Sequence, residues 1–484
     1  MLTYRVRVLP FTIGVSFWIA CLVPGVSASA APASKPNIII VMPDDIGYGD
    51  FSCLGNPIIH TPNIDAFQKQ SVRFTNFHVS PTCAPTRAAL LTGRHEFKSG
   101  VTHTIAERER LSLKATTFAQ VLKADGYATG IFGKWHLGDE QAYQPERRGF
   151  DETFVHGAGG IGQSYPGSCG DAPGNTYFSP AIRHNGVFEK TDGYCTDVFF
   201  NQALTWIDAK RKADAPFFAF ITPNAAHTPL QCPADYAKRH AGEVPENVAR
   251  FYGMIENIDD NFGRLTAALK QWGLERDTLV IFMTDNGGTI GVPIFNAGMR
   301  GAKVTPYEGG IRVPAFWRWP AAIEGDRDVS ALTAHVDVFP TIAEVVGADL
   351  SPEASRQVEG RSLVPFFKDQ KVGWPNRTLV AHVGRWERGK VESFKYVGAS
   401  IRDDRYALVN NTELYDLQTD PGQKTDVAAA HPDVLARLRQ AYKAWWLDVL
   451  PRLENEDAVG PKVNPYKEWY EKQFGEGATA APKG

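Results

Sequence analysis

The chain has 484 residues, which is long enough to bury a large hydrophobic core and to form more than one domain. Hydrophobic residues make up 43% of it and charged residues 22%, which is typical of a soluble globular protein. The formal net charge is only −3. This composition argues against a nucleic-acid-binding protein, and any attraction for an anionic ligand must come from local positive charge.

The first 30 residues have the pattern of a secretory signal peptide. Two arginines precede an apolar run from 11 to 23, and small residues then lead to Ala28-Ser29-Ala30, the expected order of positive start, apolar core and A-x-A site. The run is short for a membrane span. We therefore expect residues 1–30 to be removed and the mature protein to be periplasmic or secreted, without a membrane segment. An uncleaved anchor and a lipoprotein attached through Cys21 are the alternatives.

Five cysteines follow the predicted signal peptide, and export would place them in an oxidising compartment. They are Cys53, Cys83, Cys169, Cys195 and Cys232. Because five is odd, at least one of them cannot pair within the chain. Cys169 and Cys195 flank a loop rich in Gly, Pro and Ser and are candidates for a disulfide bond. The alternative is that all cysteines apart from Cys83 are free and buried.

From Lys35 onward, short apolar runs alternate with helical patterns, which predicts a parallel sheet with helices on both faces. Four runs are too apolar to have a solvent-exposed face, as expected for strands buried on both sides. They are 37–42, 127–132, 216–222 and 278–284. Between them, the segments 117–124 and 248–272 have the apolar spacing of amphipathic helices.

Polar residues directly follow each of these predicted strands. They are Asp44-Asp45, Lys134-Trp135-His136, His227 and Asp285-Asn286. In open α/β sheets, ligands bind beyond the carboxyl ends of the strands, so these residues are expected to converge at one edge of the sheet. The sequence therefore predicts one polar site there.

Beyond about residue 376 the pattern changes to short strands, within 394–401 and 406–417, followed by an amphipathic helix that begins at Pro432. This predicts a small antiparallel sheet with one helix. The final residues are small and polar and are expected to be loose. The predicted organisation is a signal peptide (1–30), a main catalytic domain (31–375), a C-terminal subdomain (376–474) and a flexible tail (475–484).

The most specific local motif runs from Pro81 to Arg94 and reads PTCAPTRAALLTGR. Pro85 stands where a helix begins, so Cys83 is expected at a helix N-terminus, where free N–H groups and the helix dipole favour an anion. Arg87, one turn later, has a planar guanidinium suited to an oxyanion. The alternative is an ordinary buried cysteine beside a surface arginine.

Cys83-x-Pro85-x-Arg87 followed by Thr92-Gly93-Arg94 resembles the signature of the type I, formylglycine-dependent sulfatases, which are arylsulfatase-like. The resemblance extends from residue 37 to about 427. Its further segments include 44–50 (DDIGYGD), 133–138 (GKWHLG), 226–229 (AHTP), 284–287 (TDNG) and 308–314 (EGGIRVP). It implies an α/β fold like that of alkaline phosphatase, with a large mixed or parallel sheet flanked by helices and a small C-terminal antiparallel sheet plus helix. It also implies a sulfuric ester hydrolase whose Cys83 is converted to formylglycine by a maturation enzyme.

The same resemblance assigns one Ca²⁺ ion to Asp44, Asp45, Asp285 and Asn286, with the modified Cys83 beside it. All four side chains supply oxygen ligands, which a hard cation prefers. Each pair alone has another interpretation, Asp44-Asp45 as a helix cap and Asp285-Asn286 as a turn. Two such pairs at strand ends of one sheet favour the metal site.

In the family's pattern, Arg87 and Lys134 hold the formylglycine and the sulfate. His136 resembles the base for sulfate release, whereas His227 and Lys303 contact the sulfate and protonate the leaving oxygen. A hydrated formylglycine has two hydroxyls on one carbon: one attacks sulfur, and the other lets the carbonyl re-form as sulfate leaves. Taken singly, His227 also fits a structural histidine and Lys303 a solvated surface lysine.

One part of the family's pattern has no counterpart. Some relatives place a hydroxyl-bearing residue near the sulfate, downstream of the Lys-x-His motif, and no residue of this chain aligns with it. The glycine-rich stretch 157–162 occupies that neighbourhood. The segments 157–196 and 289–300 are expected to shape the substrate pocket, because loops of this kind vary freely on a fixed scaffold.

Two other functions remain open from the sequence. The nearest is hydrolysis of phosphate or phosphonate esters, although an alkaline-phosphatase-type site needs two zinc ions and more His and Asp ligands than can be placed here. The other is an inactive glycan-binding relative, which would lack at least one of Cys83, Arg87, His136 and Asp285, and all four are present. The expected partner is a sulfated small molecule or glycan, and not nucleic acid.

Overall fold

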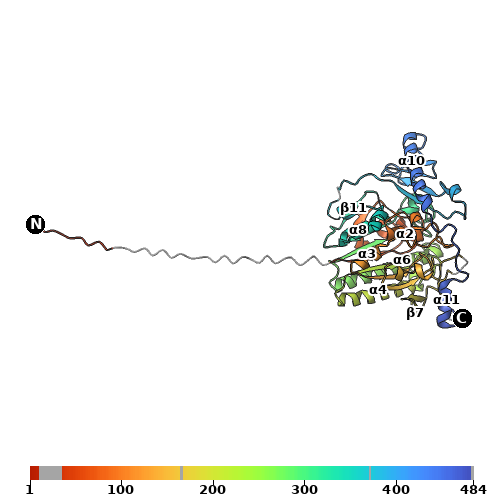
Figure 1. The fold of residues 1–484 in the computed structure, drawn as a ribbon, viewed down its shortest axis with the longest axis horizontal. Helices are drawn as coiled ribbons and strands as arrows, with labels where there is room; N and C mark the ends of the chain where they lie inside the picture. The colour runs from red at the N-terminus through yellow and green to blue at the C-terminus, as the bar shows by residue number, and fades with distance from the viewer. Residues whose placement is uncertain (10–34, 164–166, 370–371, 481–484) are drawn as a thin grey trace. The chain divides into compact units, whose positions relative to one another are not determined.

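The computed structural model describes residues 1–9, 35–163, 167–369 and 372–480. Of the predicted signal peptide only residues 1–9 are included, and they form no regular secondary structure; Cys21 and the predicted cleavage site lie outside the described residues. From Pro36 onward the chain forms one folded unit (Figure 1). No helix within the described ranges is both long and apolar enough to cross a membrane.

A ten-stranded mixed sheet forms the centre of this unit, in the order β11-β2-β10-β9-β1-β8-β4-β5-β6-β7. The four strands predicted from apolar runs lie side by side in its middle and are all parallel. They are β1 (Asn37–Val41), β4 (Ala128–Lys134), β8 (Phe217–Thr222) and β9 (Thr278–Met283). The outer strands are β2 (Val72–Phe74), β5 (Glu152–His156), β6 (Ala181–His184), β7 (Val187–Lys190), β10 (Ala315–Arg318) and β11 (Arg327–Val329). The predicted α/β fold is confirmed.

Helices cover both faces of the sheet. Successive side chains of a strand point to opposite faces, so each central strand contributes to two hydrophobic cores. Ile38 and Ile40 of β1 enter one hydrophobic core, and Ile39 and Val41 enter the other. The first core is covered by α2 (Cys83–Thr92), α3 (Phe118–Ala124) and α8 (Val338–Val346). The second is covered by α1 (Pro62–Gln68), α4 (Cys195–Lys212) and α6 (Glu246–Gln271). The predicted helices at 117–124 and 248–272 correspond to α3 and α6.

The C-terminal part contains the predicted antiparallel sheet and helix. The strands are β13 (Leu379–His382), β14 (Ala399–Arg402), β15 (Tyr406–Val409) and β16 (Glu413–Asp416), paired in that order. The helix is α10 (Pro432–Val449), whose Leu438, Tyr442 and Trp446 are buried against the sheet. Strand β13 was not predicted, and Phe394, the first residue of the predicted strand segment 394–401, is instead the last residue of a 3₁₀ turn (Val391–Phe394).

A further unpredicted helix, α11 (Pro465–Phe474), packs against β7 at the edge of the main sheet. Its Tyr466 and Tyr470 lie in one hydrophobic cluster with Phe188. Within the predicted tail, the Ala480 backbone N–H donates to the Pro173 carbonyl (2.7 Å), so the described residues 475–480 are anchored. The boundary between the catalytic domain and the C-terminal subdomain at 375/376 remains a prediction.

The predicted disulfide bond between Cys169 and Cys195 is wrong. All five cysteines among the described residues are free. Cys195 is the first residue of α4 and packs in the core under the sheet, whereas Cys169 lies beside Glu109 in a loop. The two residues therefore belong to different environments, and the alternative of free cysteines is the correct one.

Gly133 permits the close pairing of β4 and β8 directly before Lys134. Its φ is 126°, and an added Cβ would lie 2.1 Å from the Thr222 carbonyl oxygen. We expect Gly133→Ala to destabilise the protein by about 1–3 kcal/mol from overpacking, in addition to backbone strain. Gly126→Ala is the matched control, because φ there is also positive (86°) but no atom lies within 4 Å. Chemical denaturation showing equal losses for the two variants would contradict the close-packing argument.

Candidate active site

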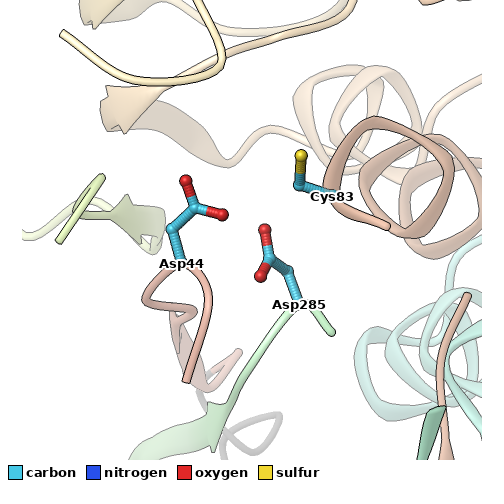
Figure 2. Close-up of side chains that lie close together, drawn as sticks. All are labelled: Asp44, Cys83 and Asp285. Atoms are coloured by element: carbon cyan, nitrogen blue, oxygen red, sulfur yellow. The ribbon is translucent and has the colours of Figure 1, made fainter. Parts of the chain in front are cut away.

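The polar residues that follow the central strands meet at the carboxyl edge of the sheet. Asp44 follows β1, Asp285 follows β9, and Cys83 is the first residue of α2. Figure 2 shows these three side chains around a common space, and one oxygen of each carboxylate and the Cys83 sulfur lie within 4.8 Å of one another. The structure therefore confirms that the residues after these strands converge at one edge of the sheet.

Cys83 is buried and lies directly beside His136. The Cys83 Sγ is 3.5 Å from His136 Nδ1, and His136 Nε2 is 2.8 Å from the Thr104 carbonyl oxygen. Because a carbonyl only accepts, Nε2 carries the proton and Nδ1 faces Cys83 as an acceptor when the ring is neutral. Burial and the charge of Lys134 lower the pKa of His136 well below its ordinary value. This histidine is therefore a neutral proton acceptor next to Cys83.

Each cation of the site is paired with a carboxylate. The pairs are Arg87 Nη2 with Asp285 Oδ2 (3.0 Å), Lys134 Nζ with Asp44 Oδ2 (2.5 Å) and Lys303 Nζ with Asp45 Oδ1. Arg87 also donates from Nη1 to the Lys134 carbonyl (3.0 Å), which ties α2 to the end of β4. Burial opposes ionisation of the Cys83 thiol, but Lys134 and Lys303 lower its pKa. The surroundings of Cys83 therefore favour negative charge.

His227 and Lys303 form the accessible side of this cluster. Their side chains are 12% and 13% exposed, whereas Lys134 is fully buried. His227 Nδ1 lies 2.6 Å from the Thr228 carbonyl, so Nε2 faces the site, 3.7 Å from Asp45 Oδ2. Although burial opposes it, the charge of Asp45 raises the pKa of Lys303. A ligand that enters from solvent meets these two residues first.

The acidic residues fit a divalent cation. Two buried oxygens, Asp44 Oδ1 and Asn286 Oδ1, have no hydrogen-bond partner, a costly arrangement that a bound ion would relieve. Burial and a neighbouring carboxylate raise the pKa of Asp44 to about 6 and that of Asp285 to about 7. Asp45 is the remaining candidate ligand, and its Oδ1 accepts a hydrogen bond from Asn286 Nδ2 (3.1 Å). An oxygen-only group of this kind suits a hard cation such as Ca²⁺.

The backbone is strained at two of these positions. Asp45 and His136 have φ values of 63° and 60°, in the left-handed region that non-glycine residues rarely adopt. Such conformations cost about 1–3 kcal/mol and persist where the surrounding structure imposes them, often at functional sites. Here they follow the ends of β1 and β4 and turn both side chains into the cluster.

The sequence had left the hydroxyl-bearing position near the sulfate unassigned, and the structure gives the reason. A Cβ on Gly159 would lie 3.3 Å from His136 Cε1, and one on Gly160 would lie 2.8 Å from His227 Nδ1. The backbone of 157–162 thus packs against both histidines and leaves little room there for a side chain. Thr104, which orients His136, was missed because only a backbone carbonyl is involved.

Comparisons with known proteins match the chain to one protein family. A family model described as Sulfatase matches residues 36–348, and one described as N-sulphoglucosamine sulphohydrolase, C-terminal, matches residues 302–444. Arylsulfatase A of Homo sapiens is 31% identical over 472 residues, which cover 87% of this chain and 89% of that protein. Arylsulfatase G of Mus musculus is 32% identical over 383 residues, 70% of each protein.

Among solved structures, the crystal structure of Ps i-CgsB in complex with k-i-k-neocarrahexaose is similar at a TM-score of 0.76 and 26% identity. The match covers 88% of this chain and 95% of that one. The family match spans most of the main sheet and its helices, and the sequence relatives extend it further along the chain. The chain therefore belongs to the sulfatase family and is a sulfuric ester hydrolase.

Proposed function

We propose that the protein hydrolyses sulfate monoesters of carbohydrates, with a formylglycine made from Cys83 as nucleophile and with one Ca²⁺ ion. The observation that carries this proposal is the meeting of the Cys83 sulfur with oxygens of Asp44 and Asp285. A nucleophile beside a hard-cation site suits attack on an anionic sulfate group. The formylglycine requires a maturation enzyme that oxidises Cys83.

The ion would be held by Asp44, Asp45, Asp285 and Asn286 and would supply charge stabilisation to the sulfate. The hydrated formylglycine would supply the attacking hydroxyl and a second hydroxyl for sulfate release. The chain's own residues position the reacting groups and transfer protons. Arg87 is fixed by Asp285 and the Lys134 carbonyl, so its remaining donor capacity is directed beside residue 83. His136 Nδ1, 3.5 Å from the Cys83 sulfur, accepts the proton of the second hydroxyl.

The leaving alcohol needs a proton on the other side of the sulfate. His227 and Lys303 are the donors available there, since both are partly accessible and both face Asp45. A carbohydrate substrate is supported by Ps i-CgsB, whose printed description names a complex with a neocarrahexaose. The N-terminal pattern supports a periplasmic or secreted enzyme, which would meet sulfated glycans outside the cell.

The alternative of a two-zinc phosphate ester hydrolase has less support. Within the described ranges, only one group of His, Cys, Asp and Glu side chains lies close enough to hold a metal ion, namely Asp44, Cys83 and Asp285. That group lacks histidine, the ligand that catalytic zinc sites use most. Phosphonate or phosphate diesters remain candidates for a side activity on the same centre.

Removal of divalent ions with a chelator should abolish sulfate release, and Ca²⁺ should restore it better than Zn²⁺, because all ligands are oxygens. Asp285→Ala should lose both the bound ion and the activity. Asp259→Asn is the control, since Asp259 is equally buried but bonds Asn63 and Ile64 away from the site. Elemental analysis showing two zinc ions per active chain would contradict the calcium assignment.

The active protein should carry an aldehyde at residue 83, detectable as a peptide mass shift and as a hydrazide adduct. Cys83→Ala should abolish turnover and leave thermal unfolding close to wild type, because only the nucleophile is lost. Cys232→Ala, which removes another free cysteine, should retain the aldehyde and the activity. A fully active protein with an intact Cys83 thiol would refute the proposed nucleophile.

The leaving-group assignment predicts unequal losses on two substrates. A sugar alkoxide needs a proton as the S–O bond breaks, whereas p-nitrophenolate does not. General acid catalysis is typically worth about 10²–10⁴-fold, so His227→Ala or Lys303→Ala should lower kcat/KM on a sulfated monosaccharide by about that much more than on p-nitrophenyl sulfate. Lys123→Ala, at an exposed lysine of α3, should change neither value. Equal losses on both substrates would mean that these residues only bind sulfate.

A further inference from the structure

A cavity of about 620 Å³ lies next to the reaction centre. It is enclosed by four separate segments of the chain, around Glu109, Asp139, Asp171 and Asn464. Its lining contains five acidic residues and three basic ones, Arg110, Lys462 and Lys467. None of these residues belongs to the sites described above.

Three short connections join the cavity to His136. Glu109 lies on the loop that follows Thr104, whose carbonyl bonds the His136 ring. Asp139 stands three residues after His136 in the chain. Asp171 Oδ2 accepts a hydrogen bond from the Gly162 N–H (2.7 Å), in the glycine-rich loop that packs against His136. The cavity therefore adjoins the reaction centre.

Two carboxylates of the cavity lining each have one buried oxygen without a hydrogen-bond partner. Glu109 Oε2 and Asp139 Oδ1 make no hydrogen bond, although the two residues are only 4% and 7% exposed. Asp171 differs, because its oxygens accept from Gly162 and from Asn175. A buried polar atom without a partner is costly and rare. The unpartnered oxygens of Glu109 and Asp139 are therefore suited to groups of a ligand.

Charge indicates what kind of ligand fits. Burial raises the pKa of Glu109 to about 8 and that of Asp139 to about 6, so near neutral pH one carboxyl donates and the other accepts. Hydroxyl groups match both roles. The five acids of the lining outnumber its three basic residues, of which Arg110 is paired with Glu140, so the net charge disfavours a second sulfate or a carboxylate.

A cation fits less well. The exposed Lys462 and Lys467 line the cavity and oppose positive charge. In the part of the chain that the structure describes, the carboxylates of this cavity do not form a group close enough to hold a metal ion. The mixed lining of acids, an amide and backbone groups is instead what hydroxyl recognition requires.

We propose that this cavity is a subsite for an uncharged sugar ring of the substrate, whose hydroxyls bond Glu109 and Asp139. The inference rests on the proposed function, since it places a neutral ring beside the sulfated one. Asn464, just before α11, donates to Asp139 Oδ2 (2.6 Å) and orients its free oxygen. The C-terminal segment thus helps to build the subsite.

Saturation-transfer NMR on the wild-type protein tests this directly and does not depend on turnover. The probes are galactose, glucose, mannose and fucose, with glucosamine, glucuronic acid and Ca²⁺ alone as charged comparisons. At least one neutral sugar should bind. Asp139→Asn should weaken that binding by about tenfold or more, the usual effect of losing a hydrogen bond to a charged group, and Glu109→Ala should weaken it as well because the donor is removed.

Two further variants test whether a loss of sugar binding comes from the cavity or from misfolding. Ser168→Phe fills the cavity from a partly exposed position without changing a buried acid, and should also abolish sugar binding. Glu96→Gln removes a buried carboxylate that lies outside the cavity lining and should bind sugar like wild type. The inference is overturned if no neutral sugar binds, if the cavity variants bind it as well as wild type does, or if only glucosamine or Ca²⁺ binds.

Kinetics separate this inference from the proposed function. If the subsite exists, KM for a sulfated oligosaccharide with a neutral neighbouring ring rises at least tenfold more in Asp139→Asn than KM for p-nitrophenyl sulfate. If sulfate release occurs but both KM values change equally, the subsite is wrong and the proposed function stands. If neutral sugars bind as expected but no sulfate ester is cleaved, the proposed function fails and the binding site stands.

Discussion

Three carboxylates are buried together at one end of a parallel sheet, and the site depends on keeping them charged. Each is paired with a cation supplied by a different part of the chain: Asp44 with Lys134, Asp45 with Lys303 and Asp285 with Arg87. Removing one partner of a buried pair costs about 3–5 kcal/mol, because the other charge is then unpaired. The six groups are formally neutral together, so a divalent cation bound there would make the centre positive and complementary to sulfate.

The parallel sheet brings these groups together, and α2 completes the arrangement. Strands β1, β4, β8 and β9 are adjacent, so their following residues share one edge. Helix α2 is buried along its whole length, which fixes Cys83 at its first position and Arg87 one turn further. Since Arg87 bonds both Asp285 and the Lys134 carbonyl, the helix and two strand ends are held as one unit. Precise placement of a nucleophile requires such rigid support.

The sequence predicted the central strands and the reaction centre, because both leave local signals: fully apolar runs and a long motif around Cys83. It did not predict β13 or α11, whose burial depends on distant partners such as Phe188 for Tyr466. The disulfide prediction failed for a related reason, since spacing along the chain does not give distance in space. Glu109 and Asp139 were missed because their cavity is built from four segments, none of which has a motif.

The proposed sulfate centre and the neighbouring cavity would discriminate in opposite directions. The proposed centre, which holds Lys303 and Arg87, would attract sulfate, whereas Glu109 and Asp139 would disfavour a second anion close by. Specificity often depends on such repulsion as much as on attraction. A uniformly sulfated substrate would be attracted to the proposed sulfate centre but disfavoured at the neighbouring cavity. The glycine-rich loop beside His136 contacts both regions, so a ligand that occupies both would have to pass this loop.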